Sequence, residues 1–443
     1  MNELIFIGTK SAGEEFYTLY RCMAIQSSRL GIAVFDLICC EVSMNHQFKL
    51  LAPVLFLVFS MLACSSSVDI LETPVPATEQ FNVPTEAPVT QADLLPHTFY
   101  YLDRDSAGLT QVYRLERDGK TQTQLTFEPV SVLDYDISLR DGSLVYEVNN
   151  QLILINADGS DRLILAEGPL RPAERGYYQP VFSPDGQTIA YADGGLKLYD
   201  VQTQTSSLLL ADQPLGGELP PAAYSPDQFS PDGTRLLINI GHPPDSPWTG
   251  AIYTLATQTI VPVAAVAGPH EPLTCCTHYG GAAWSADSSS FYAAARVPDA
   301  SLAGGELWKV DANSGAVTTL IPAAAGDGDN RLFYYEYKPF LAPDGQLYFF
   351  SAKFPESAGY LNRVPAIIVH TSPDDVINQW SVLRGDQFES VNEALWAPDA
   401  SFVIVAFALS DDVYDGGRAE IVYFDGRPNV VLVPFAQQMK WGP

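Results

Sequence analysis

Short runs of alternating hydrophobic and polar residues, separated by turns, fill the chain from about residue 97 to its end. The stretch FSPDGQTIAYADGGLKLYDVQTQTSSLLL (182–210) shows the pattern, with an aromatic residue, a Ser-Pro-Asp-Gly turn and three strand-like runs. In such a turn Pro presets φ, Asp suits the third position and Gly tolerates left-handed geometry at the fourth. The pattern predicts short β-strands joined by tight turns.

The same stretch recurs along the chain. The turn aspartates are 44 residues apart from Asp141 to Asp185 and 57 residues apart from Asp287 to Asp344. A period of this size, with several strands in each repeat, is typical of a β-propeller, in which one repeat forms one blade. The other copies begin at Phe229 (FSPDGTRLLINI), Trp284 (WSADSSSFYAAA), Leu341 (LAPDGQLYFFSA), Trp396 (WAPDASFVIVAF) and, more weakly, Ile137 (ISLRDGSLVYEV).

Each repeat also contains a second turn, such as ERDGK, NADGS or DANSG, followed by a further strand-like run. We therefore expect an all-β fold, a β-propeller of four-stranded antiparallel blades, with seven blades favoured and six or eight as alternatives. The chain ends in FAQQMKWGP, a truncated copy of an inner strand with Trp441 in the aromatic position. This segment is predicted to complete the first blade and close the ring, which removes exposed sheet edges.

The motifs FSPDG, WAPDA and INADGSDRLIL resemble the β-propeller repeat of the TolB type, which is related to WD repeats. The resemblance covers about residues 97–443 and implies the propeller fold. It is weak for function, because the family includes envelope assembly proteins, ligand-binding lipoproteins and the propeller halves of some peptidases. TolB has six blades and an additional α/β domain, for which this chain has no room.

The N-terminal region has the layout of a secretory signal. Lys49 precedes an uncharged apolar run, Leu50 to Ala63, and Cys64 follows directly. An apolar run of this length suits a signal peptide better than a membrane span. With cysteine at the cut it resembles a bacterial lipoprotein signal, although Met61 and Leu62 depart from the strictest pattern. The alternatives are a buried apolar strand or an uncleaved anchor.

This interpretation divides the chain into four parts. Residues 1–43 are predicted to be a spurious N-terminal extension, and 44–63 the lipoprotein signal peptide, with lipidation at Cys64. Residues 64–95 are rich in Pro, Thr, Ser, Glu and Gln, a composition that predicts a disordered tether. Residues 96–443 are the predicted propeller. We therefore expect an extracytoplasmic protein that is held on the cell membrane by its lipid anchor alone.

The chain carries 24 Lys and Arg against 52 Asp and Glu, a formal net charge of −28. This balance argues against nucleic acid as a partner, because phosphate contacts need clustered basic side chains. It also argues against direct docking on anionic lipid.

Long loops are predicted on one face of the disc and tight turns on the other. Binding residues concentrate on loops held by a rigid scaffold. The sharpest feature there is HEPLTCCTHYGG, in which Cys275 and Cys276 are predicted to form a vicinal disulfide. Two free buried thiols and a metal site with His270 and His278 are the alternatives. We expect no metal and no cofactor.

Aromatic residues cluster just before the predicted inner strands, where they can stack on a sugar or peptide and donate hydrogen bonds. The alternative is that the rings pack between blades and that the acidic residues beside them are solvated. The candidate ligand-binding residues are His278, Tyr279, Tyr177, Tyr178, Tyr224, Tyr334, Tyr335, Glu336 and Glu393.

No G-x-S-x-G, H-E-x-x-H or phosphate-binding glycine motif is present. We therefore expect a binding module that is not an enzyme and that takes an envelope protein, peptide or glycan. The alternatives are a propeller enzyme, glycan-cleaving or lactone-hydrolysing, with its site in the central channel, and a structural component of an envelope assembly.

Overall fold

A computed structural model describes residues 19–27, 34–42, 93–168, 178–214, 216–217, 222–242, 246–263, 282–296, 305–322, 324–325, 332–355, 365–373, 380–389, 391–408 and 415–443. The chain divides into two units, Met1–Ala87 and Pro88–Pro443. The first unit contains one antiparallel pair, β1 (Leu19–Ser27) and β2 (Val34–Val42). All regular elements within these described ranges are β-strands.

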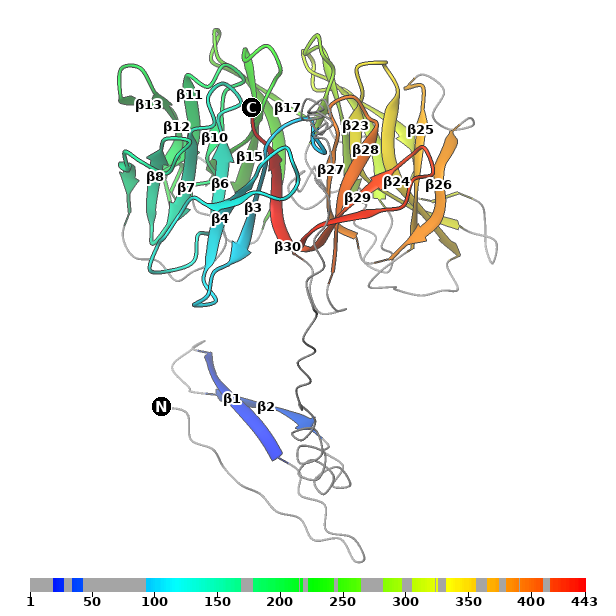
Figure 1. Ribbon diagram of the computed structural model, residues 1–443. Helices are drawn as coiled ribbons and strands as arrows, with labels where there is room; N and C mark the ends of the chain where they lie inside the picture. Colours follow the sequence, from blue (N-terminus) through cyan, green and yellow to red (C-terminus); the bar gives the residue numbers. More distant parts are fainter. Residues whose placement is uncertain are drawn as a thin grey trace, which may run out of the picture. The chain divides into compact units, whose positions relative to one another are not determined.

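The second unit is built from antiparallel blades of four strands, which confirms the predicted fold (Figure 1). Three blades are separate sheets, each with its strands in chain order. The second blade contains β6 (Asp134–Ile137), β7 (Leu144–Val148), β8 (Gln151–Ile155) and β9 (Leu163–Glu167). The third contains β10 (Val181–Phe182), β11 (Thr188–Ala192), β12 (Gly195–Asp200) and β13 (Thr205–Ala211). The fourth contains β14 (Ala223–Phe229), β15 (Arg235–His242), β16 (Ser246–Thr254) and β17 (Thr259–Pro262).

Two further groups of strands lie in a nine-stranded sheet, joined by the parallel bridge between Gly305 and Tyr335. The first group is β18 (Ala283–Trp284), β19 (Ser290–Arg296), β20 (Gly305–Asp311) and β21 (Val317–Ile321). The second is β23 (Leu332–Leu341), β24 (Leu347–Pro355), β25 (Ala366–Thr371) and β26 (Ser381–Phe388), with the short β22 (Ala324–Ala325) paired to β23. The number of blades in the whole ring stays a prediction.

The ring closes through one long strand, β30 (Val430–Trp441). Its first half pairs with β29 (Gly417–Tyr423) in the last blade, and its second half pairs with β3 (Phe99–Arg104) in the first. In Figure 1 β30, drawn in red, runs between these two blades. This confirms the predicted closure by the C-terminal segment. The last blade also contains β27 (Val391–Trp396) and β28 (Phe402–Phe407). The first blade also contains β4 (Thr110–Leu115) and β5 (Gln122–Gln124).

The recurring turn is held by its aspartate. The hydroxyl of Ser183 donates to Oδ1 of Asp185 at 2.6 Å, and the backbone N–H of Gln187 donates to the same oxygen at 3.0 Å. Gly186 has a φ of 67°, the left-handed geometry that glycine adopts without strain. These hydrogen bonds favour the ionised carboxylate, so the pKa of Asp185 lies below its usual value. The turn therefore fixes where each inner strand ends.

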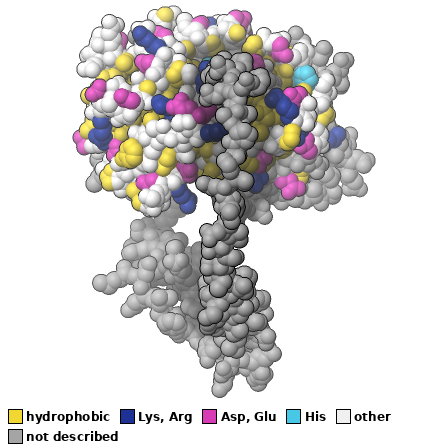
Figure 2. Space-filling model, in the orientation of Figure 1, with side chains coloured by type: hydrophobic (Ala, Val, Ile, Leu, Met, Phe, Trp, Pro, Cys, Tyr) yellow, Lys and Arg dark blue, Asp and Glu magenta, His cyan; other side chains and the backbone are white. Residues whose placement is uncertain are grey.

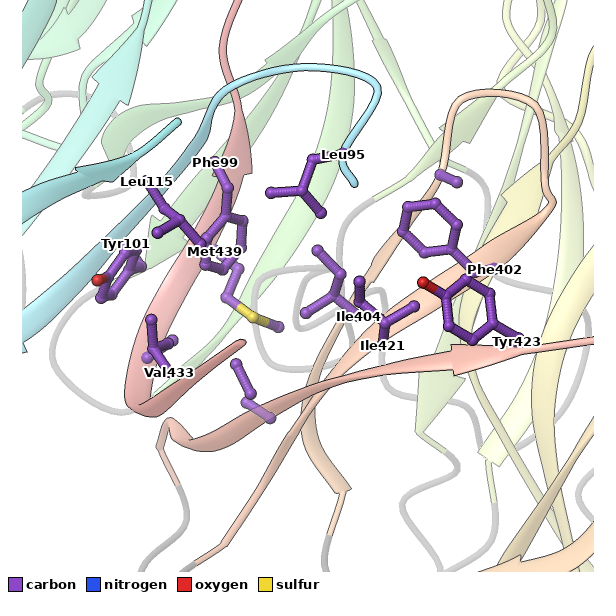
Figure 3. Packing of buried hydrophobic residues seen from close by; sticks show 14 residues of the cluster. Leu95, Phe99, Tyr101, Leu115, Phe402, Ile404, Ile421, Tyr423, Val433 and Met439 are labelled. Carbon is purple, nitrogen blue, oxygen red and sulfur yellow. The ribbon is translucent and has the colours of Figure 1, made fainter. Parts of the chain in front are cut away.

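Buried hydrophobic side chains pack between neighbouring blades. Figure 3 shows the cluster at the closure, where Met439 of β30 lies between Phe99 of the first blade and Ile404 of the last. The aromatic position of the repeat also joins blades through hydrogen bonds. The indole N–H of Trp441 donates to the carbonyl of Trp396 at 2.7 Å, and that of Trp396 donates to the carbonyl of Lys338 at 2.9 Å. The blades are thus linked by their inner ends.

Acidic and basic side chains are interspersed over the face in view in Figure 2. Within the described ranges, no helix is long and apolar enough to cross a membrane.

Candidate functional site

The inner strands are irregular at one position of the repeat. Three residues before the aromatic position the backbone is left-handed at Gln179 (φ 45°), Lys338 (φ 56°) and Gln438 (φ 52°). Such geometry is uncommon outside glycine. The ladder between β14 and β15 shifts register between Pro226 and Gln228, and the β23–β24 and β3–β30 ladders also shift. Bulges of this kind turn side chains away from the regular pleat and occur next to functional sites.

Glu393, also three residues before an aromatic position, links the last blade to the first. Its Oε1 accepts the backbone N–H of Gln438 at 2.9 Å, and its Oε2 accepts that of Met439 at 3.1 Å. Burial raises the pKa of Glu393, while these backbone hydrogen bonds and the ammonium of Lys338 oppose the rise. Both carboxylate oxygens therefore hold the ring closure.

A second set of contacts ties β30 to the second and third blades. The ammonium Nζ of Lys440 lies 2.7 Å from Oδ1 of Asp136 on β6. The other oxygen of Asp136 accepts the backbone N–H of Phe182 on β10 at 2.6 Å. The hydroxyl of Tyr135 donates to the carbonyl of Gln438 at 2.6 Å. The inner ends of three successive blades are thus joined by one lysine and one aspartate.

Asp227 of β14 faces the same lysine from the fourth blade. Burial raises the pKa of Asp227 to about 7, and the charge of Lys440 opposes the rise. Asp134 of β6 behaves alike, because burial raises its pKa to about 6 against the same opposing charge. Burial alone would lower the pKa of Lys440, but the carboxylates of Asp136, Asp134 and Asp227 raise it. The four charged groups therefore act on one another across the inner strands.

The side chains of Asp134, Asp227 and Lys440 are partly exposed, yet each is densely surrounded by other parts of the protein. Positions that line the axis of a propeller combine these two properties, because inner strands border a narrow, wet centre. We define the axial cluster as Asp134, Asp136, Gln179, Asp227, Gln438 and Lys440, which lie on the inner ends of four successive blades.

Among the residues that the structure describes, several oxygens in and beside the axial cluster have no hydrogen-bond partner. Buried polar atoms are paired in most native proteins, so each exception calls for an explanation. Ser225 and Asn239, which face each other in the β14–β15 ladder, are each only 4% exposed. The unpartnered atoms are Oδ2 of Asp227, Oε1 of Gln179, Oε1 of Gln438, Oγ of Ser225 and Oδ1 of Asn239.

The structure brings together residues that the sequence analysis did not single out. Asp134, Asp227 and Lys440 were missed because each stands alone in its own repeat. The available signal was alignment of the repeats on the aromatic position, which puts Asp134, Gln179 and Gln438 in one column. Polar residues in that column break the hydrophobic pattern of a buried strand.

Two of the predicted tyrosines pack between strands. Tyr178 is fully buried; its hydroxyl donates to the carbonyl of Asn150 at 2.8 Å, and its backbone N–H donates to Oε2 of Glu147 at 2.8 Å. Tyr224 is half-buried, and its hydroxyl accepts the amide of Gln213 at 3.4 Å. Their role in ligand binding stays a prediction.

The remaining predicted residues give no side-chain geometry. Tyr334, Tyr335 and Glu336 lie on β23, of which only the backbone is described at these positions. Cys64, Tyr177, Cys275, Cys276, His278 and Tyr279 lie outside the described residues. Across the described parts of the chain, no three His, Cys, Asp or Glu residues are arranged to hold a metal ion.

Comparisons with solved structures find propellers. TolB from Acinetobacter baumannii matches with a TM-score of 0.38 and 15% identity, over 79% of this chain and 67% of that one. An oligogalacturonate lyase in complex with manganese matches with a TM-score of 0.49 and 11% identity, over 76% of this chain and 84% of that one. A prolyl endopeptidase matches with a TM-score of 0.47 and 11% identity, over 78% of this chain but 49% of that one. No protein-family model and no curated protein matches the chain.

The expectation that the protein is not an enzyme is wrong. It was inferred from the absence of catalytic sequence motifs. The similar structures include a lyase and an endopeptidase, so the fold leaves catalysis open. Propeller enzymes assemble a site from separate blades, so linear motifs do not reveal it. At these identities the likeness concerns the fold alone. The four-stranded blades and the closure through β30 show that this chain is a β-propeller.

Proposed function

We propose that the protein binds an envelope ligand, a protein, peptide or glycan, at the axial cluster of an extracytoplasmic propeller. The observation that carries the proposal is the set of buried oxygens of described residues that lack hydrogen-bond partners on the first, third and fourth blades. An unpaired buried polar group costs about 1–3 kcal/mol. A fold that retains several of them in one place is suited to complete their hydrogen bonds with a ligand.

The attachment to the membrane is part of the same proposal. Cys64 carries the lipid after removal of residues 44–63, residues 1–43 are not part of the natural product, and residues 64–95 form the tether to the propeller. This arrangement places the propeller outside the cytoplasm within reach of envelope components.

Crosslinking in intact cells of the native producer tests the binding role. The tagged protein is purified and its partners identified by mass spectrometry, for the wild type, Asp227→Asn and Glu167→Gln. The last variant is the matched control, since it removes one carboxylate from the outer strand β9. We expect a stoichiometric partner that Asp227→Asn loses and Glu167→Gln keeps. A partner retained equally by both variants contradicts binding at the axial cluster.

A second candidate function is cleavage of a glycan at the same cluster. The carboxyls of Asp227 and Asp134, with pKa values of about 7 and about 6, are in the range that a general acid needs near neutral pH. Such values are enriched at catalytic sites. Release of reducing ends from cell-wall polysaccharide tests this function. We expect Asp227→Asn to lower the rate by about 100-fold or more if Asp227 is the acid.

A further inference from the structure

We infer that the ligand presents a protonated primary amine to the axial cluster, where Oδ2 of Asp227, Oε1 of Gln179 and Oε1 of Gln438 accept its three N–H groups. The inference rests on the proposed function, because it names the ligand chemistry of the same site.

The orientation of Gln438 supports the assignment. Its Nε2 donates to the carbonyl of Leu133 at 3.1 Å, so the amide oxygen is turned away from that carbonyl. Its backbone is fixed as well, because its N–H donates to Glu393 and its carbonyl accepts the hydroxyl of Tyr135. The left-handed backbone at Gln438 is thus held from two sides, and its free oxygen is preorganised as an acceptor.

Asp227 supplies the charge. Its carboxylate lies at the register shift of β14, and Oδ2 has no partner. Lys440 is already paired with Asp136 at 2.7 Å and so does not fill this role. A buried carboxylate is stabilised most by a cation that also donates hydrogen bonds.

The charge balance selects a cation over an anion. Asp134, Asp136 and Asp227 face the single ammonium of Lys440, so the ionised cluster is negative. In the described residues the carboxylates form no group of three that would hold a metal ion. An ammonium has three donors around one nitrogen and can meet acceptors that come from three strands, whereas a guanidinium presents a planar fork.

A pair of diamine probes separates the contribution of hydrogen bonds from ammonium N–H groups from the contribution of charge. Cadaverine has two primary ammonium groups, and its bis-trimethylammonium analogue has the same charge and spacing but no N–H. The purified full-length protein is titrated with each probe at equal ionic strength and pH 8, and binding is followed by ligand-observed NMR. We expect saturable binding of cadaverine and none of the analogue.

Variants locate the binding. We expect Asp227→Asn to weaken cadaverine binding about tenfold or more, because a hydrogen-bonded charge is lost. Gln179→Met keeps the length of the side chain, removes the acceptor and is expected to weaken binding by a smaller factor. Glu167→Gln on β9 is expected to leave the affinity unchanged. Urea unfolding of each variant shows whether it is folded before it is titrated.

Several results overturn the inference. Equal saturation by both probes indicates attraction by charge without hydrogen bonds, and equal affinity in folded Asp227→Asn places the amine elsewhere. Absence of cadaverine binding also overturns it. The two proposals remain separable. An envelope partner that Asp227→Asn loses, together with no amine binding, overturns the amine inference and leaves the proposed function standing. Amine binding at the axial cluster without such a partner supports the amine inference and contradicts the binding of an envelope partner there.

Discussion

Asp185 and Asp227 show how two aspartates of one repeat fold acquire opposite properties. The Asp185 carboxylate sits in a turn, accepts N–H and O–H donors and has a lowered pKa. The Asp227 side chain lies at a strand irregularity and is partly exposed, but its Oδ2 is buried without a hydrogen-bond partner, and its pKa is raised. The sequence motif SPDG predicts the first environment from turn chemistry alone. The second depends on which strands meet at the axis, and one repeat read in isolation does not contain that information.

The raised pKa of Asp227 makes stability depend on pH. The folded protein holds this proton up to about pH 7, whereas the unfolded chain releases it near the ordinary aspartate pKa of 3.8. The folded state therefore binds more protons between these values, and its free energy of unfolding falls as pH rises through this window. Asp227→Asn mimics the protonated form. We expect it to be more stable than the wild type at pH 8 by on the order of 2–4 kcal/mol.

Urea unfolding at pH 5 and pH 8 measures the effect. The difference between Asp227→Asn and the wild type should shrink at pH 5, where the wild-type carboxyl is already protonated. A difference of the same size at both pH values would show that ionisation of Asp227 is not its cause.

The same ionisation governs ligand affinity at the axial cluster. Only the ionised carboxylate attracts an ammonium, and the amine stays protonated throughout the range. Lys440 is the charged group that opposes the rise in the pKa of Asp227. We expect the affinity for cadaverine to increase on the order of tenfold from pH 5.5 to pH 8. Asp227→Asn is expected to remove most of that increase, and the remainder comes from Asp134, whose pKa of about 6 lies in the same range. An NMR titration at the two pH values checks this.

At the scale of elements, β30 departs from what the sequence pattern predicts. The ending FAQQMKWGP predicts a truncated inner strand of its own, whereas the structure contains one longer strand, Val430–Trp441, shared by two blades. Register shifts along its ladders let it leave one sheet and enter the next without a turn. Hydrophobic alternation reports strand propensity, but it does not report where a strand changes partners.

Met439 and Val431 lie on this strand in opposite environments. Met439 is 8% exposed in the core of the closure, whereas Val431 is 55% exposed. We expect Met439→Ala to reduce the free energy of unfolding by about 2–5 kcal/mol, since it leaves a cavity between two blades. Val431→Ala is the matched control, with an expected change within about 0.5 kcal/mol. Equal urea midpoints for the two variants would contradict a closure held by this cluster.

Glu393 holds the same closure through backbone hydrogen bonds. Replacement by Ala leaves the N–H groups of Gln438 and Met439 without their acceptor. We expect a loss of about 1–3 kcal/mol in the free energy of unfolding. Glu389→Ala is the control, because Glu389 is an exposed carboxylate four residues earlier. A cost as large for Glu389→Ala would point to net charge instead of these hydrogen bonds.

At the scale of the molecule, the repeat of the turn predicts the all-β propeller fold and the closure by the C-terminal segment. The residues of the candidate site are harder to predict from the sequence. The predicted long loops lie largely outside the described residues, and the axial cluster comes from residues as far apart as Asp134 and Lys440. Neighbours along the chain determine turns and strands, whereas the centre of a ring combines residues from every blade.

The lipid anchor is a prediction at the same scale. We expect Cys64→Ala to move the protein from the membrane to the soluble fraction and to abolish incorporation of labelled palmitate. Cys22→Ala is the control, since residues 1–43 are predicted to be absent from the natural product. Membrane association of Cys64→Ala would contradict the lipoprotein interpretation.

Because β30 is shared by the first and last blades, the first blade can complete its folding only after the C-terminus has been synthesised. Thr98 and Pro443 are joined by a hydrogen bond across 345 residues, and the N–H of Gly442 donates to the carbonyl of Thr98. During synthesis, β3 therefore leaves the ribosome long before its partner strand exists, and its edge is open to wrong pairing in the meantime. A chain shortened by a few C-terminal residues would keep that edge open permanently, and its expected fate is aggregation or proteolysis.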